Sequence, residues 1–250
     1  MKPIELSICV LHYNRWDLTK DCLASIDAQE IPCSYEKVLV DNGSEPPFKP
    51  EVLPQGWRLV RLTPNRGHIA GQNKCFEYAN GEWVLFVAND VRLHQYCLQQ
   101  LWEARDEGVL LQPTLLTVSG KVDNRGLCWD WPGYGLSVRR GNDPDAITST
   151  CYLIHKRAWH SIGRLDESLQ TSHEDIEFCL RGRILGYVAE SLPYTNATHL
   201  GNATLRHQPS HNRAAFHRDR LYVLRKHYRG LDYWTRYLTI QVLDHLPRLG

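Results

Sequence analysis

The chain has 250 residues, a length that suits one large domain or two small ones with a substantial buried core. Its 29 basic and 28 acidic residues nearly cancel, which excludes a general polyanion binder, and no nucleic-acid-binding motif is present. The sequence has neither a signal peptide nor a run of about 18 apolar residues, so we expect a cytoplasmic protein that binds no nucleic acid.

The first part of the chain alternates strand and helix signals. Asn14 is a candidate helix cap with Asp17 three residues later, and residues 67–79 predict a second helix that begins with glycine. Apolar runs predict strands at 6–11, 37–40, 57–62 and 83–88. Strands separated by such helices indicate right-handed crossovers, so we expect an α/β fold with a mostly parallel sheet covered on both faces.

The second part is less regular. Residues 95–105 predict a helix, and from about 112 to 148 the pattern loosens into Gly, Pro and aromatic residues. Order resumes with a strand near 149–154 and a short helix at 156–162. A further helix follows near residue 174.

Two adjacent carboxylates, Glu174 and Asp175, stand in the first turn of that helix. Thr171 and Ser172 just before it are suitable caps. The apolar positions expected to face the core are Ile176, Leu180 and Ile184. The helix dipole favours acids at this end, so helix stabilisation is one explanation of the pair. An acid–base site is the other.

Polar residues directly follow each predicted strand of the first part. In open parallel sheets, ligands bind at the carboxyl ends of the strands, near the switch in strand order. We therefore expect these residues to converge on one edge and form a binding site. They are Tyr13, Asn14 and Arg15, then residues 41–44 (DNGS), then Asn65, Arg66 and Gly67, and finally Asn89 and Asp90.

Several of these residues have both a chemical and a structural interpretation. Asp41 would bind a nucleobase or ribose hydroxyl, or would only form a turn beside Asn-Gly. The glycine-led helix start at 65–67 would bind phosphate through free N–H groups, or would be a plain loop. Asp90 suits a hard divalent cation, or is a solvated residue that starts the next helix. His199, which follows another predicted strand, would be a metal ligand or a structural histidine.

Eight different motifs then follow one another along the chain at sensible spacing. They are residues 7–15 (SICVLHYNR), 38–44 (VLVDNGS), 65–73 (NRGHIAGQN), 83–91 (WVLFVANDV), 163–169 (GRLDESL), 173–181 (HEDIEFCLR), 186–187 (GY) and 198–201 (THLG). Together they resemble the family 2 glycosyltransferases, especially the rhamnosyltransferase-like branch, over roughly residues 5–228. This resemblance implies the GT-A fold, a Rossmann-like sheet flanked by helices.

The resemblance also implies a role for each matching position. Asp175 would be the catalytic base, and Glu174 would position the acceptor. Asp90 would be the last residue of a D-x-D-like motif and would bind Mg²⁺ or Mn²⁺ together with His199. Residues expected to bind the donor are Tyr13, Asn14, Arg15, Asp41, Asn65, Arg66, Gly67, Asn73, Asn89 and Asp90. Because Ala88 stands where a first carboxylate would be, we expect weak metal binding.

We therefore expect an inverting transferase that moves a sugar from a nucleotide-diphosphate sugar to a hydroxyl of a glycan or lipid-linked glycan. A sugar-phosphate nucleotidyltransferase is one alternative, but residues 12–16 (HYNRW) lack the glycine-rich basic loop that such chemistry usually needs. An inactive nucleotide- or glycan-binding module is a second alternative, which Ala88 favours. Released nucleoside diphosphate in a donor panel distinguishes these possibilities.

We assign residues 1–202 to the transferase domain, with a donor half at about 1–110 and an acceptor half at 111–202. Residues 203–250 form a basic, aromatic tail with nine Arg/Lys and three Asp/Glu residues. One or two helices are expected there. Residues 214–246 either pack on the sheet or dock on an anionic membrane surface or a lipid-linked acceptor, at the inner face of the membrane.

The eight cysteines include no C-x-x-C pair and mostly lie in apolar runs. We expect them to be reduced, buried side chains. The sequons at Asn42, Asn196 and Asn202 are then expected to stay unmodified, because nothing in the sequence indicates a secretory route.

Overall fold

The computed structural model describes residues 3–137, 144–170, 172–201 and 209–245. Its strands are β1 (Leu6–His12), β2 (Tyr35–Asn42), β3 (Trp57–Leu62), β4 (Trp83–Ala88), β5 (Val91–Leu93), β6 (Val109–Leu116), β7 (Val122–Asn124), β8 (Leu127–Asp130), β9 (Tyr134–Ser137), β10 (Cys151–His155) and β11 (Val188–His199). Its helices are α1 (Trp16–Asp27), α2 (Gly67–Tyr78), α3 (Cys97–Glu103), α4 (Lys156–Ile162), α5 (Glu174–Ile184), α6 (Pro209–His227) and α7 (Gly230–His245), with a 3₁₀ turn at Pro50–Val52.

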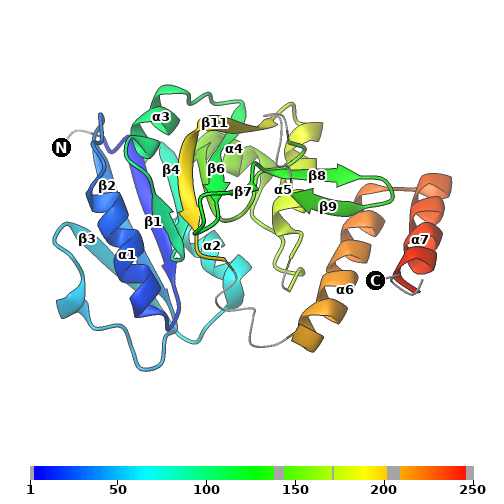
Figure 1. Cartoon of the computed structure of the whole chain (residues 1–250), viewed down its shortest axis with the longest axis horizontal. Coiled ribbons are helices and arrows are strands. Elements are labelled where there is room, and N and C mark those ends of the chain that lie inside the picture. The colour runs from blue at the N-terminus through cyan, green and yellow to red at the C-terminus, as the bar shows by residue number, and fades with distance from the viewer. Residues whose placement is uncertain (1–2, 138–143, 171, 202–208, 246–250) are drawn as a thin grey trace.

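The large sheet has the strand order β3-β2-β1-β4-β10-β6-β11-β5, and β7 pairs with β6 (Figure 1). β3, β2, β1 and β4 are parallel, as predicted for the first part of the chain. The second part is mixed, since β10 runs antiparallel to both β4 and β6 while β11 runs parallel to β6. β8 and β9 form a separate two-stranded ribbon.

Helices cover both faces of the sheet, which explains the unbroken apolar strands. Neighbouring residues of a strand point to opposite faces. Along β1, Ile8 and Val10 belong to the cluster that contains apolar residues of α1 and α3. Cys9 and Leu11 belong to the opposite cluster, which contains residues of α2, α4 and α5. All seven residues of β1 are accordingly buried.

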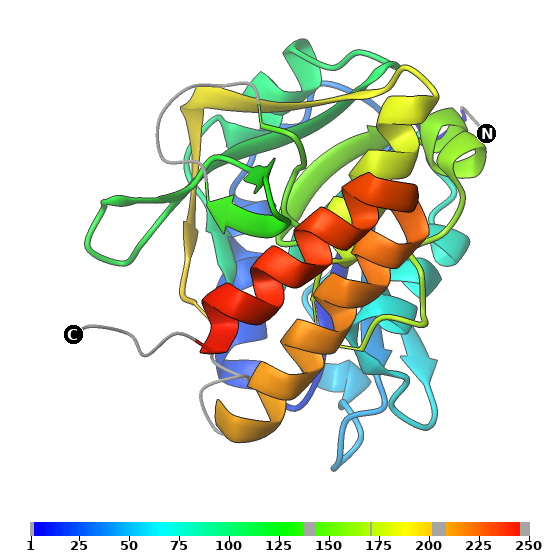
Figure 2. The ribbon, with the colours of Figure 1, turned by 90° about the vertical axis from the view of Figure 1, so that its right-hand side faces the viewer.

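The C-terminal helices add to the second of these clusters. Val223 and Leu224 of α6 and Ile240 of α7 are fully buried within it. α6 lies between α7 and the rest of the molecule, and the two helices run side by side (Figures 1 and 2). In the part of the chain that the structure describes, no helix combines the length and apolar character needed to cross a membrane.

The turn after β2 brings two segments into close contact. Gly43 has a φ of +77°, and a Cβ added there would lie 2.4 Å from the backbone nitrogen of Asn65. Glycine tolerates this φ without steric cost and leaves room for the second segment. The turn therefore holds the loop before α2 against the carboxyl end of β2.

Most predicted elements are confirmed, and β3, β4 and α4 have the predicted bounds. The segment at 112–148, left without elements, contains most of β6 and all of β7, β8 and β9. These strands are short or interrupted by Pro113, so their periodicity is weak in the sequence. All eight cysteines are free, and all but Cys33 and Cys128 are buried.

Three local predictions were wrong. The N-cap of α1 is Arg15, and the Asn14 side chain instead accepts a hydrogen bond from the Glu45 N–H at 2.7 Å. The N-cap of α5 is His173, and the Ser172 hydroxyl bonds to that imidazole rather than to the helix backbone. Ile184 is 78% exposed because α5 has passed the core by that residue. Thr171 lies outside the described residues.

Candidate functional site

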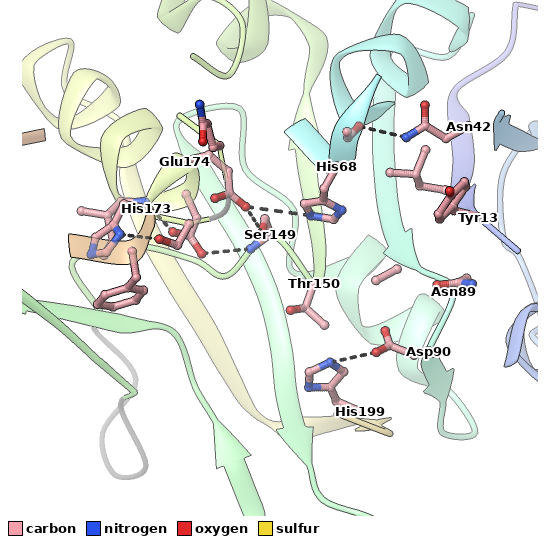
Figure 3. Close-up of a pocket in the computed structure, with 18 of the residues that line it drawn as sticks. Tyr13, Asn42, His68, Asn89, Asp90, Ser149, Thr150, His173, Glu174 and His199 are labelled. Atoms are coloured by element: carbon pink, nitrogen blue, oxygen red, sulfur yellow. Dashed lines mark hydrogen bonds and ion pairs between the residues drawn. The ribbon is translucent and has the colours of Figure 1, made fainter. Parts of the chain in front are cut away.

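A cavity of about 540 Å³ opens at the carboxyl ends of β1, β2 and β4, a size that suits a small-molecule ligand. Its walls also include the starts of α2 and α5 and the end of β11. The predicted site residues that line it are Tyr13, Asn65, Gly67, Asn89, Asp90, Glu174, Asp175 and His199. The structure thus brings eight of the predicted residues, from both halves of the chain, to one cavity (Figure 3).

The other five predicted residues do not line the cavity. Asn14 and Arg15 lie in the turn before α1, where Arg15 pairs with Asp17 at 2.7 Å. The Arg66 side chain is exposed, and its backbone N–H donates to the Asn42 side chain at 3.2 Å. Asn42, expected at this edge with the end of β2 but given no role of its own, lines the cavity.

Asp41 and Asn73 are buried, and their side chains hold backbone segments in place. Asp41 accepts hydrogen bonds from the N–H groups of Ser44 and Phe48 and pairs with Arg61. This is the turn-forming role that was the alternative for Asp41. Asn73 exchanges hydrogen bonds of 3.0 Å with the backbone of Leu165.

The start of α5 presents the carboxylate pair to the cavity. His173 adopts a left-handed conformation with φ of 66°, so the chain turns sharply just before Glu174. Ser149, which precedes β10, then contacts both acids: its hydroxyl donates to Glu174 at 2.6 Å, and its N–H donates to Asp175 at 3.4 Å. Figure 3 shows this contact on one wall of the cavity. Ser149 was expected only at the start of a strand, not as a site residue.

Burial and the adjacent Glu174 raise the pKa of Asp175 well above its usual range. Both causes favour the neutral form of Asp175. When Asp175 does lose its proton, the carboxylate is therefore a stronger base than an exposed aspartate. Perturbed carboxyl groups of this kind are typical of acid–base sites.

Behind the cavity, a buried ionic cluster fixes α5 to α6. Glu177 has no exposed side-chain area and contacts Arg181 at 2.8 Å, Lys226 at 2.9 Å and His227 at 3.2 Å. Burial opposes the charge of Glu177, but the hydrogen bonds from these three residues outweigh it and lower its pKa to about 2. Lys226 also pairs with Asp166 at 2.6 Å.

Strand pairing brings Asp90 and His199 together on the opposite wall. His199 pairs with Val91 in the antiparallel ladder of β11 and β5, and the Leu200 N–H donates to the Asp90 carbonyl at 2.9 Å. The His199 Nε2 lies 3.4 Å from the Asp90 Oδ2, as drawn in Figure 3. Burial lowers the pKa of His199, but contacts with Asp90 and Asp123 outweigh it, so the pKa is raised.

The Asp90–His199 pair fits a divalent cation in its chemistry, with one carboxylate and one imidazole facing the same cavity. Among the described residues, no three His, Cys, Asp or Glu side chains form a metal-binding cluster. Mg²⁺ sites that handle phosphates commonly use one or two protein carboxylates and take further oxygens from the substrate. Ala88 lines the cavity and supplies no carboxylate, as expected from the sequence.

His68 stands between the two walls, at the start of α2. Its Nε2 lies 3.9 Å from the Glu174 Oε1 and 2.6 Å from the Gln72 side-chain nitrogen. The remaining lining residues that sequence analysis did not single out are Leu11, Leu127, Thr150, Gln170, His173 and Phe216. Ser172 and Ile176, expected only as a helix cap and a core residue, also line it. Several come from loops or from α6, where the sequence shows no strand-end pattern.

Comparisons with known proteins agree on the family. A sequence model described as "Glycosyl transferase family 2" matches residues 7–162. The O-antigen biosynthesis protein RfbC of Myxococcus xanthus is 27% identical over 81% of this chain and 18% of its own length. The low-salt glycan biosynthesis hexosyltransferase Agl10 of Haloferax volcanii is 23% identical over 72% of this chain and 62% of its own. The chain therefore spans only part of these relatives.

Solved structures show the same fold at low identity. GalNAc-T7, crystallised with UDP, GalNAc and Mn²⁺, has a TM-score of 0.65 at 14% identity. The matched region is 79% of this chain and 43% of the GalNAc-T7 chain. S. aureus TarS in complex with UDP has a TM-score of 0.58 at 21% identity, and the matched region is 78% of this chain and 60% of the TarS chain. The GT-A fold expected from the sequence is thus confirmed. Since the family match extends over more than half of the residues, the chain belongs to the family 2 glycosyltransferases.

Proposed function

We propose that this chain is an inverting glycosyltransferase that moves a sugar from a nucleoside-diphosphate sugar to an acceptor hydroxyl. One observation carries the proposal: a single cavity has the Asp175–Glu174 pair on one wall and the Asp90–His199 pair on the other. A base for the acceptor and a site for the leaving diphosphate must face each other across the transferred sugar.

In this proposal, Asp175 acts as the general base. Its carboxylate takes the proton of the acceptor hydroxyl while that oxygen attacks the anomeric carbon. The bond between the anomeric carbon and the diphosphate oxygen breaks, and the nucleoside diphosphate leaves with the electron pair. One in-line displacement inverts the anomeric configuration. Ser149 holds both carboxylates in position, and Glu174 orients the acceptor.

The donor occupies the wall built by strand ends. Tyr13 is 40% exposed and offers a ring face to the nucleobase, and Asn65 and Gly67 are at the start of α2, where backbone N–H groups favour phosphate. Asp90 and His199 would hold a Mg²⁺ or Mn²⁺ ion, which neutralises charge on the departing diphosphate when bound.

The acceptor occupies the wall formed by α5 and α6. His173 and Phe216 line this part of the cavity, and their ring centroids lie 4.4 Å apart. Such aromatic surfaces suit the apolar face of a sugar ring. The relatives named for O-antigen biosynthesis and for low-salt glycan biosynthesis support a glycan or lipid-linked glycan acceptor.

Asp175→Asn tests the proposed base. We expect turnover, measured as nucleoside diphosphate released from a donor panel with Mn²⁺, to fall by about 10²–10⁴-fold, while donor binding is kept. In the wild type, turnover should fall as the pH drops below the raised pKa of Asp175, because the protonated carboxyl cannot accept a proton.

The control is Glu107→Gln, an exposed acid that pairs with the exposed Arg157 and should leave turnover unchanged. Full turnover by Asp175→Asn would rule out Asp175 as the base. Donor binding without turnover by the wild type, across a broad acceptor set, would favour the inactive binding module.

We also propose a peripheral contact between α7 and an anionic membrane surface, on the cytoplasmic side. Exposed apolar residues follow one face of this helix: Leu231, Trp234, Leu238 and Val242. Arg225 and Arg229 are exposed at the α6–α7 corner beside this face, where they would meet lipid phosphates.

Co-sedimentation with vesicles that contain anionic lipid tests this contact. The wild type should bind, whereas Trp234→Ser with Leu238→Ser should not, and binding should weaken with salt. Equal sedimentation of both proteins would refute the contact.

A further inference from the structure

Asp123 occupies an unusual position in the short strand β7. Val122 pairs with Leu116 and Asn124 pairs with Leu115, so Asp123 is an extra residue between two consecutive pairs. Such a β-bulge redirects a side chain and commonly occurs beside active sites. Here the bulge lies next to β11, because Leu116 also pairs with Thr198, the residue before His199.

The Asp123 side chain contacts the imidazole of His199 from behind. Its Oδ2 lies 3.2 Å from Nδ1, whereas Nε2 lies 3.4 Å from the Asp90 Oδ2. Asp90 and His199 line the cavity, and Asp123 is not among the lining residues. The imidazole is therefore held between two carboxylates, one in the cavity wall and one outside it.

We propose that Asp123 is a positioning residue that prepares His199 to bind the divalent cation of the donor site. By accepting a hydrogen bond from Nδ1–H, Asp123 fixes the tautomer whose Nε2 lone pair points toward Asp90. Carboxylate partners of this kind orient metal-binding histidines and raise their basicity. This inference rests on the proposed function, since it needs His199 to be a metal ligand.

The hairpin that carries Asp123 also has hydrogen bonds of its own. The turn between β6 and β7 is closed by its own bonds: the Thr117 N–H donates to the Lys121 carbonyl at 2.8 Å, and the Lys121 N–H donates to the Thr117 hydroxyl at 3.2 Å. Replacing Asp123 should therefore change the state of His199 while the hairpin keeps its structure.

Binding of Mn²⁺ at a fixed, saturating UDP concentration tests the proposal without an activity assay. Free Mn²⁺ is followed by its electron paramagnetic resonance signal, against a blank with UDP alone. We expect Asp123→Ala to weaken Mn²⁺ binding about 10–100-fold, and His199→Ala to weaken it at least as much. Asp123→Asn keeps an oxygen acceptor for Nδ1–H, so its affinity should lie between those of Asp123→Ala and the wild type.

Nitrogen-15 NMR of the imidazole supplies a readout that a merely structural role would not change. The wild type should show a protonated Nδ1 that Asp123→Ala no longer fixes. Asp130→Ala removes an exposed acid from β8 and serves as the control for lost charge. It should bind Mn²⁺ like the wild type.

The outcomes separate the inference from the proposed function. If His199→Ala weakens Mn²⁺ binding and Asp123→Ala does not, the positioning role is refuted and the metal site stands. If neither variant changes the affinity, His199 is not a ligand and both assignments fail. Should Asp123→Ala not fold, Asp123→Asn decides: a Mn²⁺ affinity equal to that of the wild type would refute the positioning role of the Asp123 carboxylate.

Discussion

The proposed donor and acceptor walls of the cavity are held in place by different kinds of interaction. On the donor wall, backbone ladders fix Asp90 beside His199, and a glycine turn holds the loop of Asn65. On the acceptor wall, side chains fix the acids, with Ser149 in front of α5 and the cluster of Glu177 behind it. A wall held by backbone should respond to changes in chain geometry, and a wall held by ionic side chains should respond to changes in charge and pH.

The largest expected effect is on the acceptor wall. Glu177→Gln leaves Arg181, Lys226 and His227 near one another without their buried counter-charge. Removing one partner of a buried ionic cluster should lower the free energy of unfolding by about 3 kcal/mol, measured by urea denaturation. Glu107→Gln is the exposed control and should change it little.

The pH dependence sharpens this prediction. Because the folded-state pKa of Glu177 is lowered to about 2, its stabilisation is present above the unfolded-state pKa of about 4.3. It is lost as the pH falls from that value toward 2. The difference between wild type and Glu177→Gln should shrink over the same range, and a constant difference would contradict the ionic role.

A smaller effect is expected from a backbone change on the donor wall. Gly43→Ala forces a side chain into a positive φ, at a cost of about 1–2 kcal/mol, and pushes its Cβ against the backbone of Asn65. The loop must then shift, so UDP binding should weaken along with stability. Titration with UDP measures the first effect, and thermal unfolding measures the second.

Gly56→Ala is the matched control for the donor wall. Gly56 has a φ of +84°, and an added Cβ would meet only the Lys37 side chain at 3.8 Å. This variant should lose a similar stability and keep its UDP affinity. Equal UDP affinities for the two variants would show that the contact of Gly43 does not position the loop.

The smallest expected effect is a gain in stability rather than a loss, from a substitution of Asp175. The raised pKa of Asp175 means that wild-type stability falls as the pH rises above the unfolded-state value of about 3.9 toward the folded-state pKa. Asp175→Asn cannot ionise, so it should be more stable than the wild type near pH 7, by about 1 kcal/mol. Thermal unfolding at pH 5 and pH 8 should show that the stability advantage of Asp175→Asn grows with pH. A constant advantage would argue against a raised pKa of Asp175 in the folded state.

The same contrast explains which parts of the site could be predicted. Asn65, Asn89 and Asp90 follow apolar strands, and the topology of a parallel sheet alone brings such positions together. Ser149 and Asp123 have no comparable signal, since one precedes a strand and the other lies in a bulge that only strand pairing creates. Phe216 reaches the cavity from α6, far along the chain, and no sequence pattern connects that helix with the strand ends.

Other residues were predicted to bind the donor but do not line the cavity. Asp41 and Asn73 belong to motifs that resemble the family, and sequence likeness does not tell whether a conspicuous polar side chain faces a ligand or the backbone. In the structure, both are occupied by backbone partners. In the proposed function, these two residues would act on the donor only through the segments that they hold.

The attachment of α6 to α5 also has a consequence for how the protein is made. Synthesis delivers the N-terminal part first, so β1, β2 and β4 emerge well before Lys226 and His227. Until those residues arrive, Glu177 has only Arg181 of its three basic partners, and Phe216 is absent from the cavity. The strand ends at β1, β2 and β4 are therefore made early, whereas the proposed acceptor wall is completed only once α6 has been made.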